Sequence, residues 1–258
     1  MGKSGIDGMT YCLGMLLDEG LIMMADTRTN AGVDNFSSYK KLHCLANKPD
    51  RCIYVATAGN LSLTQMVISL VQEGIDAEDG SDMTRSIGGV SSMFRAAQLI
   101  GEAVRKASEA IGPALEAHNI SASISLLLGG RIGDGPPSLY LMYEAGNFIQ
   151  CKPEVPFFQV GETKYGRPIL DRVIKRGIPL PEAVKIGCLS FDSSMRSNLG
   201  VARPIDLMVM PTDPARDVLR KRSEQDDEYF NDVSRRWSGL LHDATLTIPD
   251  PPFMRHLG

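Results

Sequence analysis

The order of the apolar segments constrains the fold of this chain more than any single motif does. The strand-like segments of the first half, in which apolar residues alternate or run continuously, are residues 10–17, 21–25, 42–46 and 53–57. Two helical apolar patterns follow, residues 63–74 and 93–111, and Pro113 is expected to end the second. The first half therefore predicts strands followed by two helices.

The second half of the chain repeats this order. Its strand-like segments are residues 122–128, 139–143, 148–151 and 205–210. Two helical segments, residues 168–174 and 181 to about 190, precede the last strand. Each sheet face and each apolar helix stripe must be buried against another element. We therefore expect an α+β fold, a four-layer αββα sandwich of two stacked, mainly antiparallel sheets flanked by helices.

Length and composition suit one domain. A chain of 258 residues that is 43% hydrophobic can bury a sizeable core, and we expect a single domain over residues 9–258. Residues 1–8 have the polar, glycine-containing look of an expression leader. A helical extension is expected from about Asp213, and it docks either on its own domain or on a neighbouring subunit. Its apolar face consists of Phe230, Val233, Trp237, Leu240 and Leu241.

Several functional classes are disfavoured. The net charge of -4 and the scattered basic residues give no basic face for nucleic acid. No apolar run reaches the length of a membrane span. Five cysteines without close pairing indicate a reducing cytoplasm. The four histidines have no partners at metal-ligand spacing and no Gly-x-Ser-x-Gly elbow is present, so we expect no metal, cofactor or serine triad. The glycine-rich segment 130–137 lies between strands and is expected to be a turn.

Thr10 is the candidate nucleophile. It opens the first strand-like segment directly after Met9, so removal of Met9 would give threonine a free amino group. An amine with an ordinary pKa near 7.7 to 8 is partly neutral at cytoplasmic pH and can accept the proton of the Thr10 hydroxyl. The alternative is that Thr10 is only a β-branched residue suited to a strand.

Three further residues follow in a characteristic order. Asp26 ends the second strand-like segment, Lys41 opens the third, and Gly59 lies between a strand and a helix. Together with Thr10, this order resembles the proteasome β-subunit family of N-terminal nucleophile hydrolases. Residues 161–166 and 192–198 are similar to its bacterial branch called Anbu, the ancestral β subunit. The resemblance runs from Met9 to about residue 210 and implies the same αββα fold.

The resemblance implies a role for each of these residues. The Lys41 ammonium would favour the deprotonated amine and hydroxyl of Thr10, and Asp26 would hold Lys41 charged and in place. We choose Lys41 over Lys40 because the family's lysine directly precedes an apolar strand residue, and two adjacent strand residues cannot both face Thr10. The Gly59 amide would stabilise the oxyanion. The alternatives are a surface ion pair for Asp26 and Lys41 and a plain turn at Gly59.

The last candidates come from the Anbu-like segments. Asp192, with either Ser194 or Ser197, falls where the family places an aspartate and a serine near the amine; alternatively, Asp192 and the serines cap or break a helix. Glu162 replaces the serine of a Gly-Ser-Gly motif. Its carboxylate would either raise the pKa of the Thr10 amine and weaken activity, or face the start of the following helix.

These residues predict a cytoplasmic threonine-type peptidase that cleaves peptides or unfolded protein through an acyl-enzyme. Two alternatives remain open. One is an amidohydrolase of the same class acting on small amides, and the other is a catalytically weak or idle self-assembling scaffold. In each case the resemblance implies a homo-oligomer, either a ring or a single-turn spiral.

Overall fold

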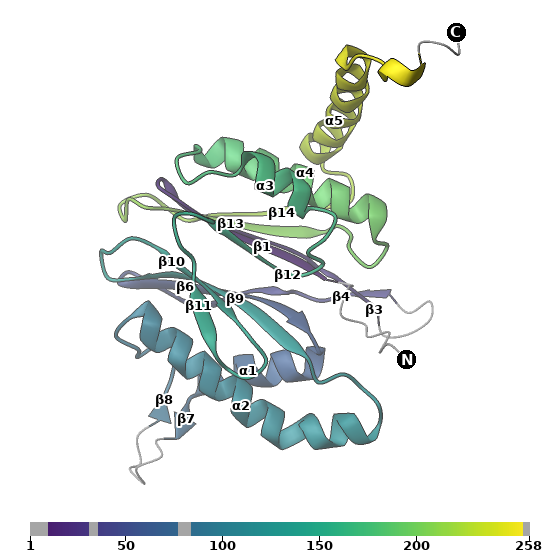
Figure 1. The fold of residues 1–258 in the computed structure, drawn as a ribbon. Coiled ribbons are helices and arrows are strands. Elements are labelled where there is room, and N and C mark those ends of the chain that lie inside the picture. The colour runs from purple at the N-terminus through teal and green to yellow at the C-terminus, as the bar shows by residue number, and fades with distance from the viewer. Residues whose placement is uncertain (1–9, 31–35, 77–83, 255–258) are drawn as a thin grey trace.

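Two five-stranded sheets form the centre of the molecule, as a computed structural model shows for residues 10–30, 36–76 and 84–254 (Figure 1). Both sheets are entirely antiparallel. The first has the order β12-β1-β2-β13-β14 and the second the order β11-β10-β9-β6-β5. The strands of the first sheet are β1 (Tyr11–Leu17), β2 (Gly20–Asp26), β12 (Phe157–Gly161), β13 (Ile205–Pro211) and β14 (Leu219–Ser223). Those of the second are β5 (Leu42–Lys48), β6 (Arg51–Gly59), β9 (Ile124–Ile132), β10 (Ser138–Met142) and β11 (Phe148–Gln150).

Helices cover the outer face of each sheet. The second sheet is covered by α1 (Leu61–Glu73) and α2 (Met93–Ala117), and the first by α3 (Arg167–Val173) and α4 (Leu180–Ser197) (Figure 1). The described chain also includes two short hairpins, β3 (Arg28–Asn30) with β4 (Phe36–Ser38) and β7 (Ile75–Asp76) with β8 (Thr84–Arg85). The expected four-layer αββα sandwich is therefore confirmed.

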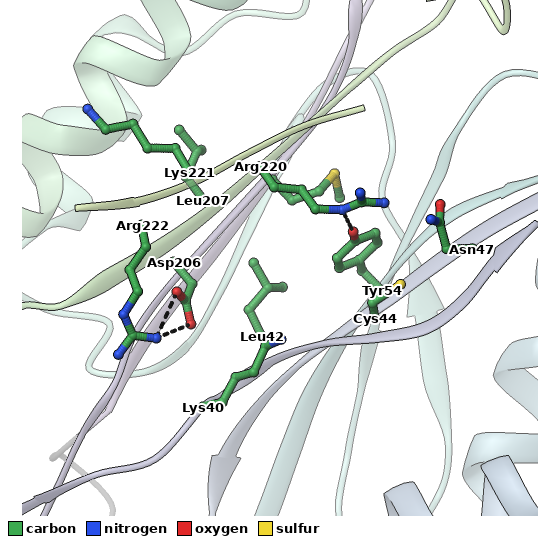
Figure 2. Close-up of a pocket in the computed structure, with 11 residues that line it drawn as sticks. Lys40, Leu42, Cys44, Asn47, Tyr54, Asp206, Leu207, Arg220, Lys221 and Arg222 are labelled. Atoms are coloured by element: carbon green, nitrogen blue, oxygen red, sulfur yellow. Dashed lines mark hydrogen bonds and ion pairs between the residues drawn. The ribbon is translucent and has the colours of Figure 1, made fainter. Parts of the chain in front are cut away.

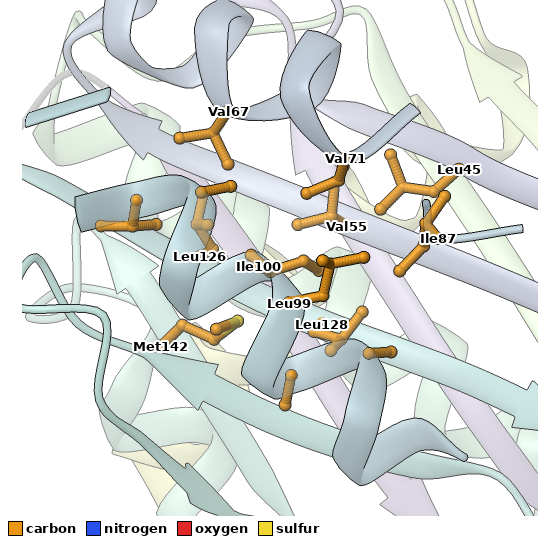
Figure 3. Close-up of a cluster of buried hydrophobic side chains, with 14 of the residues drawn as sticks. Leu45, Val55, Val67, Val71, Ile87, Leu99, Ile100, Leu126, Leu128 and Met142 are labelled. Carbon is orange, nitrogen blue, oxygen red and sulfur yellow. The ribbon is translucent and has the colours of Figure 1, made fainter. Parts of the chain in front are cut away.

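Three apolar clusters correspond to the three spaces between the layers. One lies between the second sheet and its helices and includes Val55, Val67, Ile100 and Leu128 (Figure 3). Another lies between the first sheet and its helices, and the third lies between the two sheets. Because both faces of the central strands are covered, β2 is buried at all seven positions. This explains why its sequence is continuously apolar rather than alternating.

Two helices extend beyond their expected ends. α2 continues past Pro113 to Ala117, because proline removes only one backbone donor and Leu115 packs against the cluster beneath the helix. α4 continues past Ser190 to Ser197, with Phe191 and Ser194 among its buried residues. The interpretation of Asp192 and the neighbouring serines as capping or breaking a helix is therefore wrong. Burial outweighs their weak helix propensity.

Sequence patterns did not indicate two strands of the first sheet. β12 joins β1 along an edge, and β14 carries the consecutive cations Arg220, Lys221 and Arg222. Charged residues are common on exposed edge strands, where they discourage pairing with another chain. Of the glycine-rich segment 130–137 that was expected to be a turn, residues 133–137 connect β9 to β10, whereas the first three residues belong to β9.

The C-terminal extension forms α5 (Glu228–Thr247), which projects away from the sandwich (Figure 1). Phe230 is buried and Val233 packs against the cluster under α4, whereas Leu240 and Leu241 are exposed. The helix thus docks on its own domain through its first turns only. Within the described chain, no helix combines the length and the apolar character needed to cross a membrane. The expected leader and Met9 lie outside the described residues.

Candidate functional site

Thr10 lies immediately before β1 and is partly buried. Its carbonyl oxygen accepts a hydrogen bond of 2.6 Å from the backbone N–H of Glu162, at the end of the neighbouring strand. Gly161 approaches Thr10 so closely that a Cβ atom there would clash with this carbonyl, and its φ of +80° also favours glycine. Backbone contacts to β12 therefore help to fix the position of Thr10.

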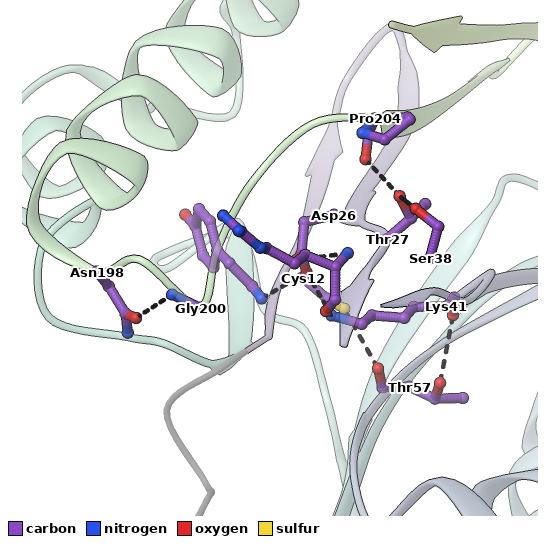
Figure 4. A network of polar contacts seen from close by, with 11 residues as sticks. Cys12, Asp26, Thr27, Ser38, Lys41, Thr57, Asn198, Gly200 and Pro204 are labelled. Carbon is purple, nitrogen blue, oxygen red and sulfur yellow. Dashed lines mark hydrogen bonds and ion pairs between the residues drawn. The ribbon is translucent and has the colours of Figure 1, made fainter. Parts of the chain in front are cut away.

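Asp26 ends β2 beside the start of β1 and is fully buried. Its Oδ1 atom accepts a hydrogen bond of 2.9 Å from the backbone N–H of Tyr11 and another of 2.9 Å from Lys41 Nζ (Figure 4). Its Oδ2 atom accepts the backbone N–H of Arg28 at 3.2 Å. One carboxylate oxygen thus connects the strand that carries Thr10 with the cation on the opposite sheet.

Lys41 precedes β5, and its side chain is only 6% exposed. Its Nζ atom also donates to the carbonyl of Arg28. The neighbouring Lys40 is exposed and lines a separate cavity at the side of the sandwich (Figure 2). The two lysines therefore point in different directions, and Lys41 is the one that meets Asp26. The pair is buried, which excludes an ordinary surface ion pair.

Burial raises the pKa of Asp26 to about 6, because the ionised carboxylate loses contact with water. The Lys41 ammonium and the backbone N–H groups of Tyr11 and Arg28 oppose this rise. At neutral pH Asp26 is therefore mainly ionised and can hold the Lys41 ammonium. The same carboxyl group takes up a proton when the pH falls below about 6.

The sequence did not single out Tyr11, the residue directly after Thr10, yet both its backbone N–H and its side-chain hydroxyl make buried hydrogen bonds. Its hydroxyl lies 2.7 Å from Ser190 Oγ and accepts a hydrogen bond of 2.7 Å from Gln159 Nε2. Ser190 Oγ donates to the carbonyl of Gly166 at 3.0 Å, so Tyr11 must donate its proton to Ser190. Burial raises the pKa of the Tyr11 hydroxyl and keeps it a neutral donor.

This chain of hydrogen bonds holds β1 against α4 and β12. The ring of Tyr11 also packs on that of Phe191, with the ring centroids 4.4 Å apart. Both the backbone and the side chain of the residue after Thr10 are thus fixed. An aromatic residue with a polar tip directly after a candidate nucleophile was the only sequence signal for this role.

Gly59 ends β6 with a φ of +104°, and a Cβ atom there would clash with the carbonyl of Ser123. Asn60 follows as the N-cap of α1, accepting hydrogen bonds from the backbone N–H groups of Ser62 and Leu63. The turn between β6 and α1 is therefore present and requires glycine. The oxyanion role of the Gly59 amide stays a prediction.

Asp192 and Ser194 make hydrogen bonds away from Thr10. Asp192 Oδ1 accepts a hydrogen bond of 2.6 Å from Ser234 Oγ on α5, and Oδ2 accepts Arg196 Nε at 2.9 Å. Ser194 Oγ donates to the Ser190 carbonyl at 3.0 Å, and Ser197 is exposed. No hydrogen bond between described residues joins any of these side chains to Thr10.

The carboxylate of Glu162 is buried and has local partners. Oε1 accepts the backbone N–H of Lys164 at 2.7 Å, and Oε2 accepts Asn198 Nδ2 at 2.9 Å. Glu162 therefore ties the segment before α3 to the C-terminal end of α4. This resembles the expected placement near the following helix, although the contact precedes the first helical residue.

The described part of the chain contains no group of three or more His, Cys, Asp or Glu residues that could hold a metal ion. The residues around Thr10 offer a threonine hydroxyl, a buried Asp–Lys pair and backbone N–H groups. Together with a free Thr10 amine, such a set suits nucleophilic attack on a carbonyl carbon. The Met9–Thr10 junction, which decides whether the amine is free, lies outside the described residues.

Comparison with solved structures gives close matches over nearly the whole chain. An Anbu (Gly-1) mutant from Hyphomicrobium sp. strain MC1 is 42% identical, with a TM-score of 0.84, and the match covers 94% of this chain and 99% of that one. Anbu from Yersinia bercovieri is 36% identical with a TM-score of 0.83, and the match covers 94% and 98%. A helical assembly of the Anbu complex from Pseudomonas aeruginosa is 41% identical with a TM-score of 0.86, and the match also covers 94% and 98%. No protein-family model and no curated protein matched the chain.

Proposed function

Because this chain belongs to the Anbu (ancestral β-subunit) family of proteasome-like N-terminal nucleophile hydrolases, we propose that it is a threonine-type peptidase with Thr10 as the nucleophile. The observation that carries the proposal is the position of Asp26. A single oxygen of its carboxylate binds both the Tyr11 backbone N–H, next to Thr10, and the Lys41 ammonium. A buried ion pair is weak evidence for stability, because the cost of removing two charges from water can exceed their attraction. The position of this pair beside Thr10 therefore supports a functional role.

In the proposed reaction the neutral amine of Thr10 takes the proton from the Thr10 hydroxyl as Oγ attacks the carbonyl carbon of the substrate. A carbon–oxygen bond forms and the electron pair of the carbonyl moves to its oxygen. The Gly59 backbone N–H stabilises this oxyanion. The protonated amine then gives its proton to the leaving nitrogen as the carbon–nitrogen bond breaks. Water, activated by the same amine, hydrolyses the acyl-enzyme.

Lys41 acts electrostatically in this scheme. Its ammonium favours the neutral amine and stabilises negative charge that develops on Thr10 Oγ. Asp26 keeps the ammonium in place inside a site that is largely shielded from water. Asp192 and Ser194 enter the proposal only as supports of α4, because their side chains bind Ser234, Arg196 and the Ser190 carbonyl.

A second candidate is a catalytically weak or idle scaffold. It is favoured by Asp192, whose carboxylate is occupied by α5 rather than free to orient the amine. Both candidates include self-association into a ring or a single-turn spiral, which the helical assembly of the Pseudomonas aeruginosa relative supports. We place the protein in the cytoplasm, since all five cysteines are free thiols.

The test is covalent labelling by a threonine-directed epoxyketone, measured by intact mass on protein with a free Thr10 amine. We expect one adduct per chain in the wild type and none in Thr10→Ala, with the same oligomer size for both. Peptide and small-amide substrates then separate a peptidase from an amidohydrolase. Equal labelling of Thr10→Ala would place the nucleophile elsewhere, and no labelling of either protein would favour the scaffold.

A further inference from the structure

A polar cavity of about 460 Å³ lies at the end of the sandwich opposite the candidate active site. Three chain segments line it: the β5–β6 turn, the β9–β10 turn and the loop before β14. Cys52, at one end of β6, pairs with Arg131 of β9, whereas Gly59 ends β6 on the Thr10 side. These seven steps along a strand separate the two places by roughly 23 Å.

Arg131 lines this cavity and is only 8% exposed. Its Nη1 atom donates to the carbonyls of Pro211 and Thr212, both at 3.1 Å. Within the described part of the chain, its guanidinium has no carboxylate partner, and its Nε and Nη2 groups have no hydrogen-bond acceptor. Two backbone carbonyls therefore satisfy Nη1, while the Nε and Nη2 donors stay available to an oxyanion in the cavity that Arg131 lines.

The charge of the lining has the opposite sign to that of the whole chain. Five cationic residues face three carboxylates there, a balance of +2, whereas the chain carries -4. The cationic residues are Lys48, Arg51, Arg131, Arg216 and Arg220. The carboxylates are those of Asp50, Asp134 and Asp217.

Three of these cations differ in the partners that they have among the described residues. Arg51 is paired with Asp50 at 2.6 Å. Arg220 donates its Nε proton to the hydroxyl of Tyr54 and lies over the Tyr54 ring, with no carboxylate partner among the described residues (Figure 2). The Arg216 side chain makes no hydrogen bond or ion pair with another described residue. Three arginines without a carboxylate partner among the described residues therefore line the cavity: Arg131 from the second sheet, Arg220 from β14 of the first sheet, and Arg216 from the loop between β13 and β14.

We propose that this cavity binds a small oxyanion, of the phosphate or carboxylate type, through Arg131 and Arg216. Guanidinium groups present paired N–H donors that match two oxygens of such an anion, which a chloride ion does not. The site is separate from Thr10 and does not depend on the proposed peptidase activity.

The test is isothermal titration and thermal melting of the assembled protein with sodium phosphate or sodium acetate, at an ionic strength matched with sodium chloride. We expect saturable binding of at least one oxyanion, and the two salts distinguish phosphate from carboxylate chemistry. Arg131→Gln and Arg216→Gln should each weaken the binding by about ten-fold or more, as expected for losing a charge-assisted hydrogen bond. Arg216→Gln removes no contact within the described residues, so it serves even if Arg131→Gln does not fold.

Two controls make the result specific. Arg172→Gln removes an exposed arginine of α3 that does not line the cavity, and this variant should bind the oxyanion as the wild type does. Thr10→Ala should also bind it normally. Melting shifts that match those of chloride, equal binding by Arg216→Gln, or loss of binding in Thr10→Ala would each overturn the proposal.

Discussion

Lys41 Nζ lies 2.9 Å from Asp26 Oδ1, and the pair joins the two sheets of the sandwich at the start of β1. Both side chains are almost completely buried. The same Asp26 oxygen accepts the backbone N–H of Tyr11, so the position of the cation and that of the residue after Thr10 depend on one atom. We therefore expect substitution of either residue to alter the position of Thr10 more than it alters the rest of the fold.

Replacing Lys41 by methionine should reduce the rate of epoxyketone labelling by about 100-fold, because the cation that favours the neutral amine is lost. Methionine retains the buried volume, and Asp26 can take up a proton once its partner is gone. Lys40→Met is the matched control, since Lys40 is exposed and lines a different cavity. Intact-mass time courses measure both rates, and a larger loss in Lys40→Met would reverse our choice of lysine.

Asp26 should make stability depend on pH. Its pKa is about 6 in the folded protein, against an ordinary value of 3.8 for an aspartate in an unfolded chain, so as the pH rises from about 4 to 6 the unfolded chain loses this proton first. The unfolding free energy of the wild type should therefore fall relative to Asp26→Asn, by roughly 3 kcal/mol for about two pKa units. Urea unfolding at pH 4, 5, 6 and 7, at one protein concentration, measures the difference. Parallel pH profiles for the two proteins would contradict the assignment.

Tyr11→Phe should leave Gln159 Nε2 and Ser190 Oγ without their shared hydroxyl. We expect a stability loss of about 1 to 3 kcal/mol and a labelling rate lower by about ten-fold, because Thr10 is positioned less accurately. Tyr140→Phe, at a buried tyrosine of the second sheet, is the control and should label normally. If both variants label at the same rate, Tyr11 does not position Thr10.

The exposed half of α5 should contribute to assembly. Leu240 and Leu241 are 61% and 47% exposed on a helix whose described contacts with its own domain run from Phe230 to Ser238. Clustered apolar side chains of this kind mark interaction surfaces. Changing both leucines to glutamate should reduce the oligomer size in analytical ultracentrifugation while far-UV circular dichroism is unchanged. Leu199→Glu, at a more exposed leucine outside α5, should leave the size as it is.

The sequence predicted those parts of the site that depend on local pattern. Period-two alternation showed that only one of Lys40 and Lys41 can face Thr10, and the resemblance to the family, whose lysine directly precedes an apolar strand residue, selected Lys41. The layer order also followed from the sequence, because the strands and the two helix pairs alternate along the chain as an αββα sandwich requires. The turn at Gly59 was predicted because this glycine lies between a strand-like segment and a helical pattern.

Contacts between residues distant in the sequence could not be predicted. Tyr11 meets Gln159 and Ser190, which are 148 and 179 residues away. Asp192 turns toward Ser234, 42 residues later, only because α5 folds back onto α4. The strand β14 was missed because its consecutive cations do not look like a strand in the sequence. Such residues are common on a strand at the edge of a sheet, and local pattern does not reveal that position.

The most direct test of the central claim is the N-terminal residue of the mature protein isolated from its own cell, read by intact mass and N-terminal sequencing. The peptidase mechanism requires threonine, with the amine of Thr10 free and unmodified. A mature chain that begins at Thr10 is the predicted result. A chain in which Met9 or any earlier residue is still joined to Thr10 would contradict it, because the proposed base would then be part of a peptide bond.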